Sequence, residues 1–193
     1  MERDMKNSPA PASDYGWPLR PRTEKPAIPA FATRWLAHGV TIFMSAVFLD
    51  SLRFKFTNAP KTQIIFGDLD AWAASFGAGG LFAQTGLFSQ HVIGGAELIA
   101  SIILLATMVL PRFRFLQPIG ALLGVAIMTG AISFHLFTPL GVNVDGDGGA
   151  LFFTACGVWI GGFVLLILRR RDAAELGRRL AAFFAPSFGK RSV

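Results

Sequence analysis

One stretch, IGGAELIASIILLATMVL, decides the fold; it runs from Ile93 to Leu110 and is almost entirely apolar. With Gln90–Val92 added it reaches about 20 residues, which at about 1.5 Å per residue is long enough for a helix to cross the hydrocarbon core of a bilayer. The stretch contains one carboxylate, Glu97. Because a charge inside a membrane is costly, such a group generally faces other helices, finds a partner and marks a site. We therefore expect a membrane protein that is organised around the partners of Glu97.

The composition agrees with this class. Of the 193 residues, 52% are hydrophobic and 16% are charged, whereas soluble domains have roughly 25% charged residues. The net charge of +6 comes from basic residues that flank the apolar runs, without an aromatic nucleic-acid-reading motif. These positions indicate membrane orientation and argue against a nucleic-acid partner.

The apolar runs predict an all-α membrane protein, a bundle of four transmembrane helices with interfacial amphipathic helices. We expect the spans over residues 34–55, 90–110, 115–135 and 149–168. Residues 1–30, rich in proline and mixed charge, predict a flexible cytoplasmic tail. Residues 31–171 form the expected membrane domain, and residues 172–193 form an interfacial helix with a tail.

Two of the connecting segments carry local signals. Residues 58–80 contain apolar side chains at helical spacing, which predicts an amphipathic helix that caps the bundle or acts as a substrate lid. In the loop 141–149, the spacing of Asp145 and Asp147 resembles the start of a calcium loop. The glutamate that such a loop requires downstream is missing, so we interpret the segment as a turn.

The basic residues predict the orientation. Of the 18 lysines and arginines, fifteen lie in the N-terminal segment, the link between spans two and three, and the C-terminal segment. The remaining three lie in the connection between spans one and two. By the positive-inside rule, this asymmetry predicts an inner-membrane protein with both termini in the cytoplasm.

Depth along the four spans predicts a polar cluster in the outer third of the bundle. Glu97 should lie roughly 9 Å below the outer boundary. The other polar groups expected at a similar depth are Asp50, Arg53, Lys55, His135, Thr154 and Cys156. Glycine pairs four residues apart, Gly120 with Gly124 and Gly157 with Gly161, predict close helix contacts.

Two interpretations of this cluster stay open. In the first, Glu97 pairs with Arg53 or Lys55 while His135 hydrogen-bonds nearby, and the cluster only holds the bundle in register. In the second, Glu97 and His135 exchange protons beside a bound quinone or small substrate, with Asp50, Arg53 and Lys55 completing the binding site.

Metal and thiol chemistry find little support in the sequence. The histidines His38, His91 and His135 are not clustered with each other or with a cysteine, so we predict no metal site. We interpret His38 as a packing or interfacial residue. The single cysteine, Cys156, excludes a disulfide within the chain.

Four short motifs, taken in order and spacing, resemble the DoxX family of small four-span membrane proteins. They are DSLRFKF (50–56), GGAE (94–97), MTGAISFH (128–135) and DGGALF (147–152). The resemblance covers about residues 34–171.

This resemblance implies a redox-linked membrane role. Relatives include subunits associated with quinone-linked sulfur oxidation, with terminal oxidases and with redox-stress complexes. We therefore expect a subunit or accessory of a membrane redox complex, without independent catalytic activity, that contacts quinone in its outer half. Expected partners are membrane lipids and either other membrane subunits or further copies of the chain. A structural or assembly protein is the alternative, and a small-molecule transporter is a weaker one.

Overall fold

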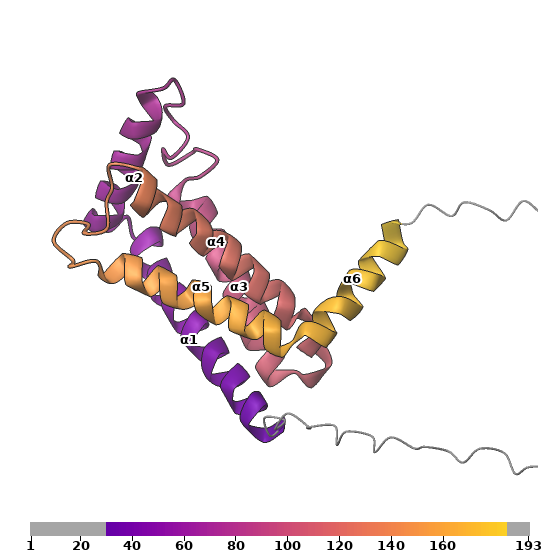
Figure 1. The fold of residues 1–193 in the computed structure, drawn as a ribbon. Coiled ribbons are helices and arrows are strands. Elements are labelled where there is room, and N and C mark those ends of the chain that lie inside the picture. Colours follow the sequence, from indigo (N-terminus) through magenta and orange to yellow (C-terminus); the bar gives the residue numbers. More distant parts are fainter. Residues whose placement is uncertain (1–29, 185–193) are drawn as a thin grey trace, which may run out of the picture.

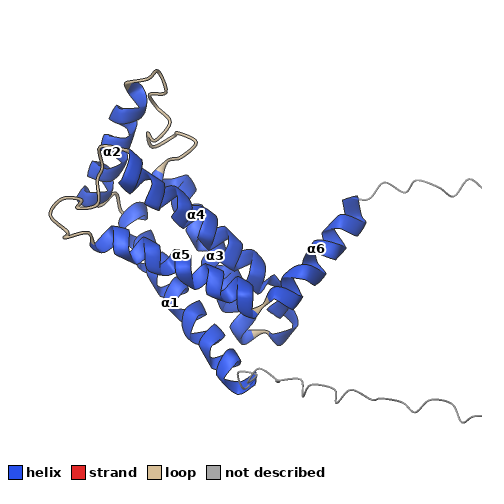
Figure 2. Ribbon diagram, viewed as in Figure 1, coloured by secondary structure: helices blue, strands red, loops and turns tan. Residues whose placement is uncertain are grey.

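The computed structural model describes residues 30–184 and is built from helices throughout that part of the chain. The elements, in order, are α1 (Ala30–Phe56), α2 (Pro60–Ala74), α3 (Gln90–Val109), the short 3-10 helix η1 (Pro111–Leu116), α4 (Gln117–Phe137), α5 (Ala150–Leu168) and α6 (Arg170–Phe184). Figure 2 shows these helices joined by loops. The predicted all-α class is confirmed.

Four segments are long and apolar enough to cross a membrane: Phe31–Phe56, Gln90–Val109, Pro111–Phe137 and Ala150–Leu168. They correspond to the four predicted spans. The helices α1, α3, α4 and α5 form a bundle in which α1 packs on α3 and α5, and α4 packs on the same two neighbours (Figure 1). The chain is therefore a multi-pass membrane protein with a four-helix core.

Large side chains of α1 fill the centre of the bundle. Met44 and Phe48 are fully buried, and both approach Gly124 of α4. A Cβ atom at Gly124 would lie 2.8 Å from Cε of Met44, and one at Gly162 of α5 would lie 2.5 Å from Cγ2 of Val125. These glycines let the helices approach closely, as the glycine spacing predicted for Gly124.

The outer surface of the four helices is apolar. Exposed large hydrophobic side chains occur on every span, among them Ile42, Ile102, Leu122 and Ile160. In water such a surface would be costly, but a lipid environment covers it without loss because lipid tails are as apolar as the side chains. The inside of the bundle is thus distinguished from its outside by small residues and polar groups rather than by hydrophobicity.

One end of the bundle, here called the cap end, carries α2 and the two longest loops (Figure 1). A second apolar core holds them together and consists of buried Leu69, Ala73, Phe82, Leu140 and Val144. Asp70 of α2 fixes the loop that follows, because its Oδ1 accepts hydrogen bonds from the backbone N–H groups of Gly80 (2.9 Å) and Phe82 (3.0 Å). The predicted helix is therefore present at one end of the bundle, and its role as a cap or as a substrate lid stays a prediction.

The opposite end, here called the basic end, contains the start of α1, η1 and the junction of α5 with α6 (Figure 1). From this junction α6 runs away across the bundle axis, as expected for a helix that lies along a membrane surface. The start of α1 and the end of α5 lie at the same end of the bundle. The predicted tails over residues 1–29 and 185–193 lie outside the described residues.

Candidate functional site

Glu97 of α3 forms an ion pair with Lys55 near the end of α1. Nζ of Lys55 lies 2.9 Å from Oε1 and 3.0 Å from Oε2 of Glu97, so the ammonium group contacts both carboxylate oxygens. The Glu97 side chain is 3% exposed and that of Lys55 is 15% exposed. Of the two cations that the sequence offered as partners, the structure selects Lys55.

Neighbouring residues of α1 and α3 surround this pair. Nζ of Lys55 also donates to Oγ of Ser51, one turn earlier in α1. Gly94 lies beside the stem of Lys55, because a Cβ atom there would be in van der Waals contact, at 3.5 Å, with Cδ of Lys55 and Cζ of Phe56. A buried ion pair of this kind adds little net stability over an apolar pair, but removing one partner leaves an uncompensated charge and costs several kcal/mol.

Gln90, at the first position of α3, connects the ion pair to the cap. Its Nε2 donates to the backbone carbonyl of Lys55 (2.9 Å) and to Oδ1 of Asn58, and its Oε1 accepts from Nε2 of Gln63 in α2 (2.8 Å). Gln90 is 2% exposed. One buried amide therefore joins α1, α2 and α3 where the chain turns between the first two helices.

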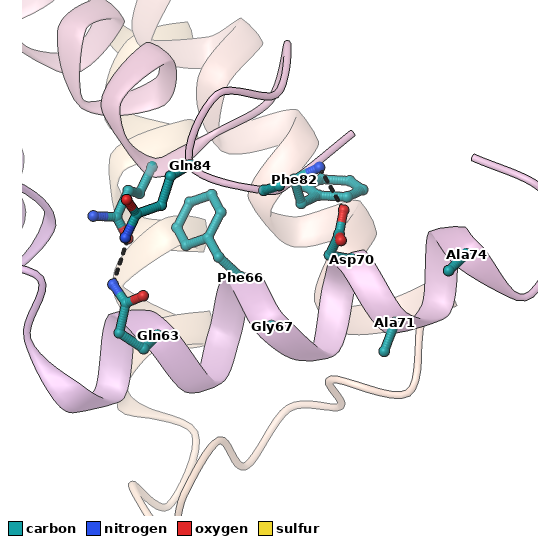
Figure 3. Close-up of a pocket in the computed structure, with 10 residues that line it drawn as sticks. Gln63, Phe66, Gly67, Asp70, Ala71, Ala74, Phe82 and Gln84 are labelled. Atoms are coloured by element: carbon teal, nitrogen blue, oxygen red, sulfur yellow. Dashed lines mark hydrogen bonds between the residues drawn. The ribbon is translucent and has the colours of Figure 1, made fainter. Parts of the chain in front are cut away.

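A pocket of about 350 Å³ opens beside Gln90, between α2 and the loop that precedes α3. Figure 3 shows Gln63 and Gln84 at one end of this pocket, Asp70 with Phe82 at the other, and Phe66 between them. Glu97 and His135 do not line it. This cap pocket offers amide groups and aromatic rings, with the one carboxylate already engaged by backbone N–H groups.

His135 lies at the end of α4, and its ring contacts the following loop and α5. Its Nδ1 is 2.6 Å from the backbone carbonyl oxygen of Gly141, and its ring packs edge-on against Phe152 of α5. Its imidazole therefore ties the loop between α4 and α5 to the bundle. The only polar partner that the structure gives to the ring within residues 30–184 is this carbonyl, so Glu97 and His135 are not hydrogen-bonded to each other.

The expected convergence of all four helices is wrong for three residues. Asp50 and Arg53 form an ion pair with each other, at 3.0 Å between Nε and Oδ1, but their side chains are 61% and 69% exposed. Thr154 of α5 is also exposed. The depth of these groups along their helices could be predicted from residue counts. The rotation of α1, however, turns Asp50 and Arg53 outward while Lys55 faces α3.

Asp147 organises the loop before α5. Its Oδ1 accepts from the N–H groups of Val144 (3.0 Å) and Gly149 (2.9 Å), and its Oδ2 accepts from Leu151 (3.1 Å) in the first turn of α5. Burial of the carboxyl raises its pKa. These hydrogen bonds and the charge of Lys61, 4.0 Å away, lower the pKa by more, so it lies below the ordinary aspartate value. The interpretation of this segment as a turn fits the geometry.

Metal-binding groups do not gather anywhere in residues 30–184: no set of three or more His, Cys, Asp or Glu side chains could hold an ion together. Among the described residues, the lining of the cap pocket includes the amides of Gln63 and Gln84 and the rings of Phe66 and Phe82. The Lys55–Glu97 pair lies outside that pocket.

A second polar link lies at the basic end and was not foreseen from the sequence. Gln117, 2% exposed at the first position of α4, donates from Nε2 to Oγ1 of Thr41 (2.8 Å) and accepts from Nε of Arg169 (2.6 Å). It thus connects α1, α4 and the end of α5. Gln90 and Gln117 share a signal that could have been noticed: each begins a span and lies in helical phase with its buried face, Gln90 with Glu97 and Gln117 with Gly124.

Comparison of this chain with family models, with curated proteins and with solved structures finds no match.

Proposed function

We propose that the chain is a DoxX-like inner-membrane protein that serves as a subunit or accessory of a quinone-linked redox complex and catalyses no reaction of its own. The observation that supports the absence of a catalytic role in this proposal is the closed state of Glu97. Its carboxylate is almost completely buried, and both of its oxygens contact Lys55. A group that exchanges protons with a substrate needs access to that substrate, whereas a paired buried carboxylate holds two helices together.

The cap end is the surface through which such a subunit would act. The sequence motifs that resemble the DoxX family supply the redox context. In this proposal, a quinone headgroup lies in the cap pocket, where Gln63 and Gln84 donate hydrogen bonds and Phe66 and Phe82 flank the ring. Gln90 holds the floor of the pocket in place by joining α1, α2 and α3.

Three variants test this proposal in membranes from the native cell. The first, Glu97→Gln, leaves the Lys55 ammonium without a carboxylate and should lower the amount of folded protein. The second, Lys55→Met with Glu97→Met, removes both charges and should restore the protein together with its co-purifying redox subunits. The measurement is the recovery of intact complex after mild solubilisation, with quinone-linked electron transfer measured alongside.

The third variant, Gln84→Ala, probes the cap pocket. Gln84 is exposed, so the fold should be unaffected. Labelling by a photoreactive quinone should fall in this variant. It should remain unchanged in a matched variant that alters Thr85, an exposed residue outside the pocket. A Glu97→Gln protein that folds normally but loses electron transfer would show instead that Glu97 takes part in the chemistry.

A purely structural or assembly role is the second candidate, and the closed ion pair favours it equally. The two differ in what the protein binds. A structural protein would show no quinone labelling and no redox subunit after gentle purification, while its Lys55 and Glu97 variants would change only its stability. The co-purifying proteins therefore decide between the two candidates.

A further inference from the structure

The basic end contains a cluster of basic side chains. His38 of α1 is half-buried, and Arg34 lies one turn earlier in the same helix. Arg114 of η1 and Arg169 at the C-terminal end of α5 are half-buried as well. These four residues come from α1, η1 and the end of α5, and they are here called the basic corner. Within residues 30–184, the ion pairs of the structure involve Lys55, Arg53, Lys61 and Arg178, and no arginine of the basic corner.

Two nitrogen atoms of the basic corner are buried without a hydrogen-bond partner among the described residues. They are Nδ1 of His38 and Nε of Arg114. Buried polar atoms almost always have a partner, and an unpaired one costs free energy. The guanidinium of Arg169 is held in place through Nε by Gln117, which leaves its other nitrogens available. The corner thus contains one anchored guanidinium group and two buried nitrogen atoms that lack a partner.

The chemistry of these donors selects the ligand. Arginine guanidinium groups bind phosphate oxygens through several directed hydrogen bonds, and a partly buried group of them favours a dianionic or monoanionic phosphate over a neutral ligand. Basic pockets between transmembrane helices on the cytoplasmic side are suited to anionic lipid headgroups. The ligand class is therefore a phosphate ester.

An apolar groove next to the basic corner favours a lipid over free phosphate. The groove lies between α1 and α5, has a volume of about 560 Å³, and is lined by Trp35, Gly39, Phe43, Ile160 and Val164, among others. Trp35 connects the two features, because its ring lines the groove and also packs edge-on against His38, 6.4 Å between centroids. An acyl chain in this groove would have its headgroup beside the corner.

We propose that the basic corner, formed by Arg34, His38, Arg114 and Arg169, binds the phosphate of an anionic phospholipid whose acyl chain lies in the groove between α1 and α5. The lipid supplies the acceptors that His38 and Arg114 lack. It would also join α1 to η1 and α5 at the basic end. This site is independent of the function proposed above.

The experiment compares variants of the full chain purified in a neutral detergent. The probes are phosphatidylglycerol, phosphatidylcholine and inorganic phosphate, and the readout is the shift in thermal unfolding temperature during titration. Phosphatidylglycerol should stabilise the natural protein, and the other two should not. In Arg114→Gln the apparent affinity for phosphatidylglycerol should fall roughly fivefold to tenfold.

The matched control is Arg112→Gln, which removes the same charge from an exposed position of the same short helix. It should bind phosphatidylglycerol as the natural protein does. If Arg114→Gln does not fold, Arg34→Gln replaces it, since Arg34 is exposed and its loss should leave the fold intact.

Three results would overturn the proposal. An equal loss of affinity in Arg112→Gln would mean that diffuse surface charge attracts the lipid. Equal stabilisation by phosphatidylcholine would mean that the basic corner does not distinguish an anionic lipid from a zwitterionic one. A full shift with inorganic phosphate alone would mean that the site takes a free anion and that the groove plays no part.

Discussion

The two ends of the bundle differ in whether their buried charges are paired within the protein. At the cap end, Lys55 is neutralised by Glu97, and Gln90 joins three helices through paired amide groups. At the basic end, Gln117 makes a similar three-helix link, but the arginines around it have no carboxylate partner among residues 30–184. The buried charges of the cap end are neutralised within the protein, whereas in the proposal above a bound lipid neutralises those of the basic end.

This difference follows from where the two ends lie in a membrane. Lys55 and Glu97 are enclosed by α1 and α3, where neither water nor lipid headgroups can solvate a lone charge, so the protein must supply both ions. Arginines at the boundary of the apolar spans can reach phosphates of the membrane surface. Removing the buried charge of Lys55 or Glu97 should therefore cost much more stability than removing a charge at the basic end.

The largest expected effect is that of Lys55→Met, which leaves Glu97 buried without a counter-ion. The free energy of unfolding should fall by about 3–5 kcal/mol. The matched variant Arg53→Met lies two residues earlier, removes the same charge from an exposed ion pair, and should cost no more than about 1 kcal/mol. Unfolding in a denaturing detergent, followed by circular dichroism, measures both; equal losses would contradict the assigned rotation of α1.

Gln90→Leu should have the next largest effect. It leaves Gln63, Asn58 and the carbonyl of Lys55 without their shared partner at the cap end. We expect a loss of about 1–3 kcal/mol, with faster hydrogen exchange in α2 than in α4. A variant in which α2 exchanges as slowly as in the natural protein would show that the apolar core of the cap is sufficient without Gln90.

Gln117→Leu is the counterpart at the basic end and should cost less, about 0.5–1.5 kcal/mol. The side chain of Arg169 loses one partner but can turn towards the membrane surface, because it is only half-buried. The same unfolding measurement applies. A larger loss in the free energy of unfolding than in Gln90→Leu would contradict the expectation that polar links at the cap end contribute more stability than those at the basic end.

The smallest effect concerns Asp147 and depends on pH. Its pKa is below the ordinary aspartate value because backbone N–H groups and Lys61 outweigh the effect of burial. The carboxylate therefore contributes stability above its unfolded pKa of about 3.9. That contribution is lost as the pH falls from there through the lower folded pKa.

Asp147→Asn should flatten the loss of stability in acid, and Asp145→Asn, at an exposed position of the same loop, should leave it unchanged. Thermal unfolding as a function of pH compares the three proteins. Identical acid profiles for the natural protein and Asp147→Asn would show that the loop does not hold the carboxylate in its ionised form.

The fold could be predicted from the sequence because apolar run length and the positions of prolines and glycines determine where membrane helices begin and end. The four spans and a helix over Pro60–Ala74 follow from those signals. For the site, only the depth of its residues along the helices could be predicted. Arg53 and Lys55 differ by two residues, and only the rotation of α1 decides which one meets Glu97.

The sequence does contain a signal for that rotation. Met44, Phe48, Leu52 and Lys55 are spaced by four, four and three residues, so Lys55 continues the buried face of α1. What lay beyond sequence reasoning is the partner of His135. Its hydrogen bond to the carbonyl of Gly141 depends on the path of a glycine-containing loop, which no side-chain pattern encodes.

The most direct test of the central claim is a double-mutant cycle on Lys55 and Glu97. Unfolding free energies are measured for the natural protein, Lys55→Met, Glu97→Met and the double variant. We expect each single change to cost several kcal/mol and the double change to cost less than either. Two small, additive losses would contradict the claim that these two side chains form one closed pair that holds α1 to α3.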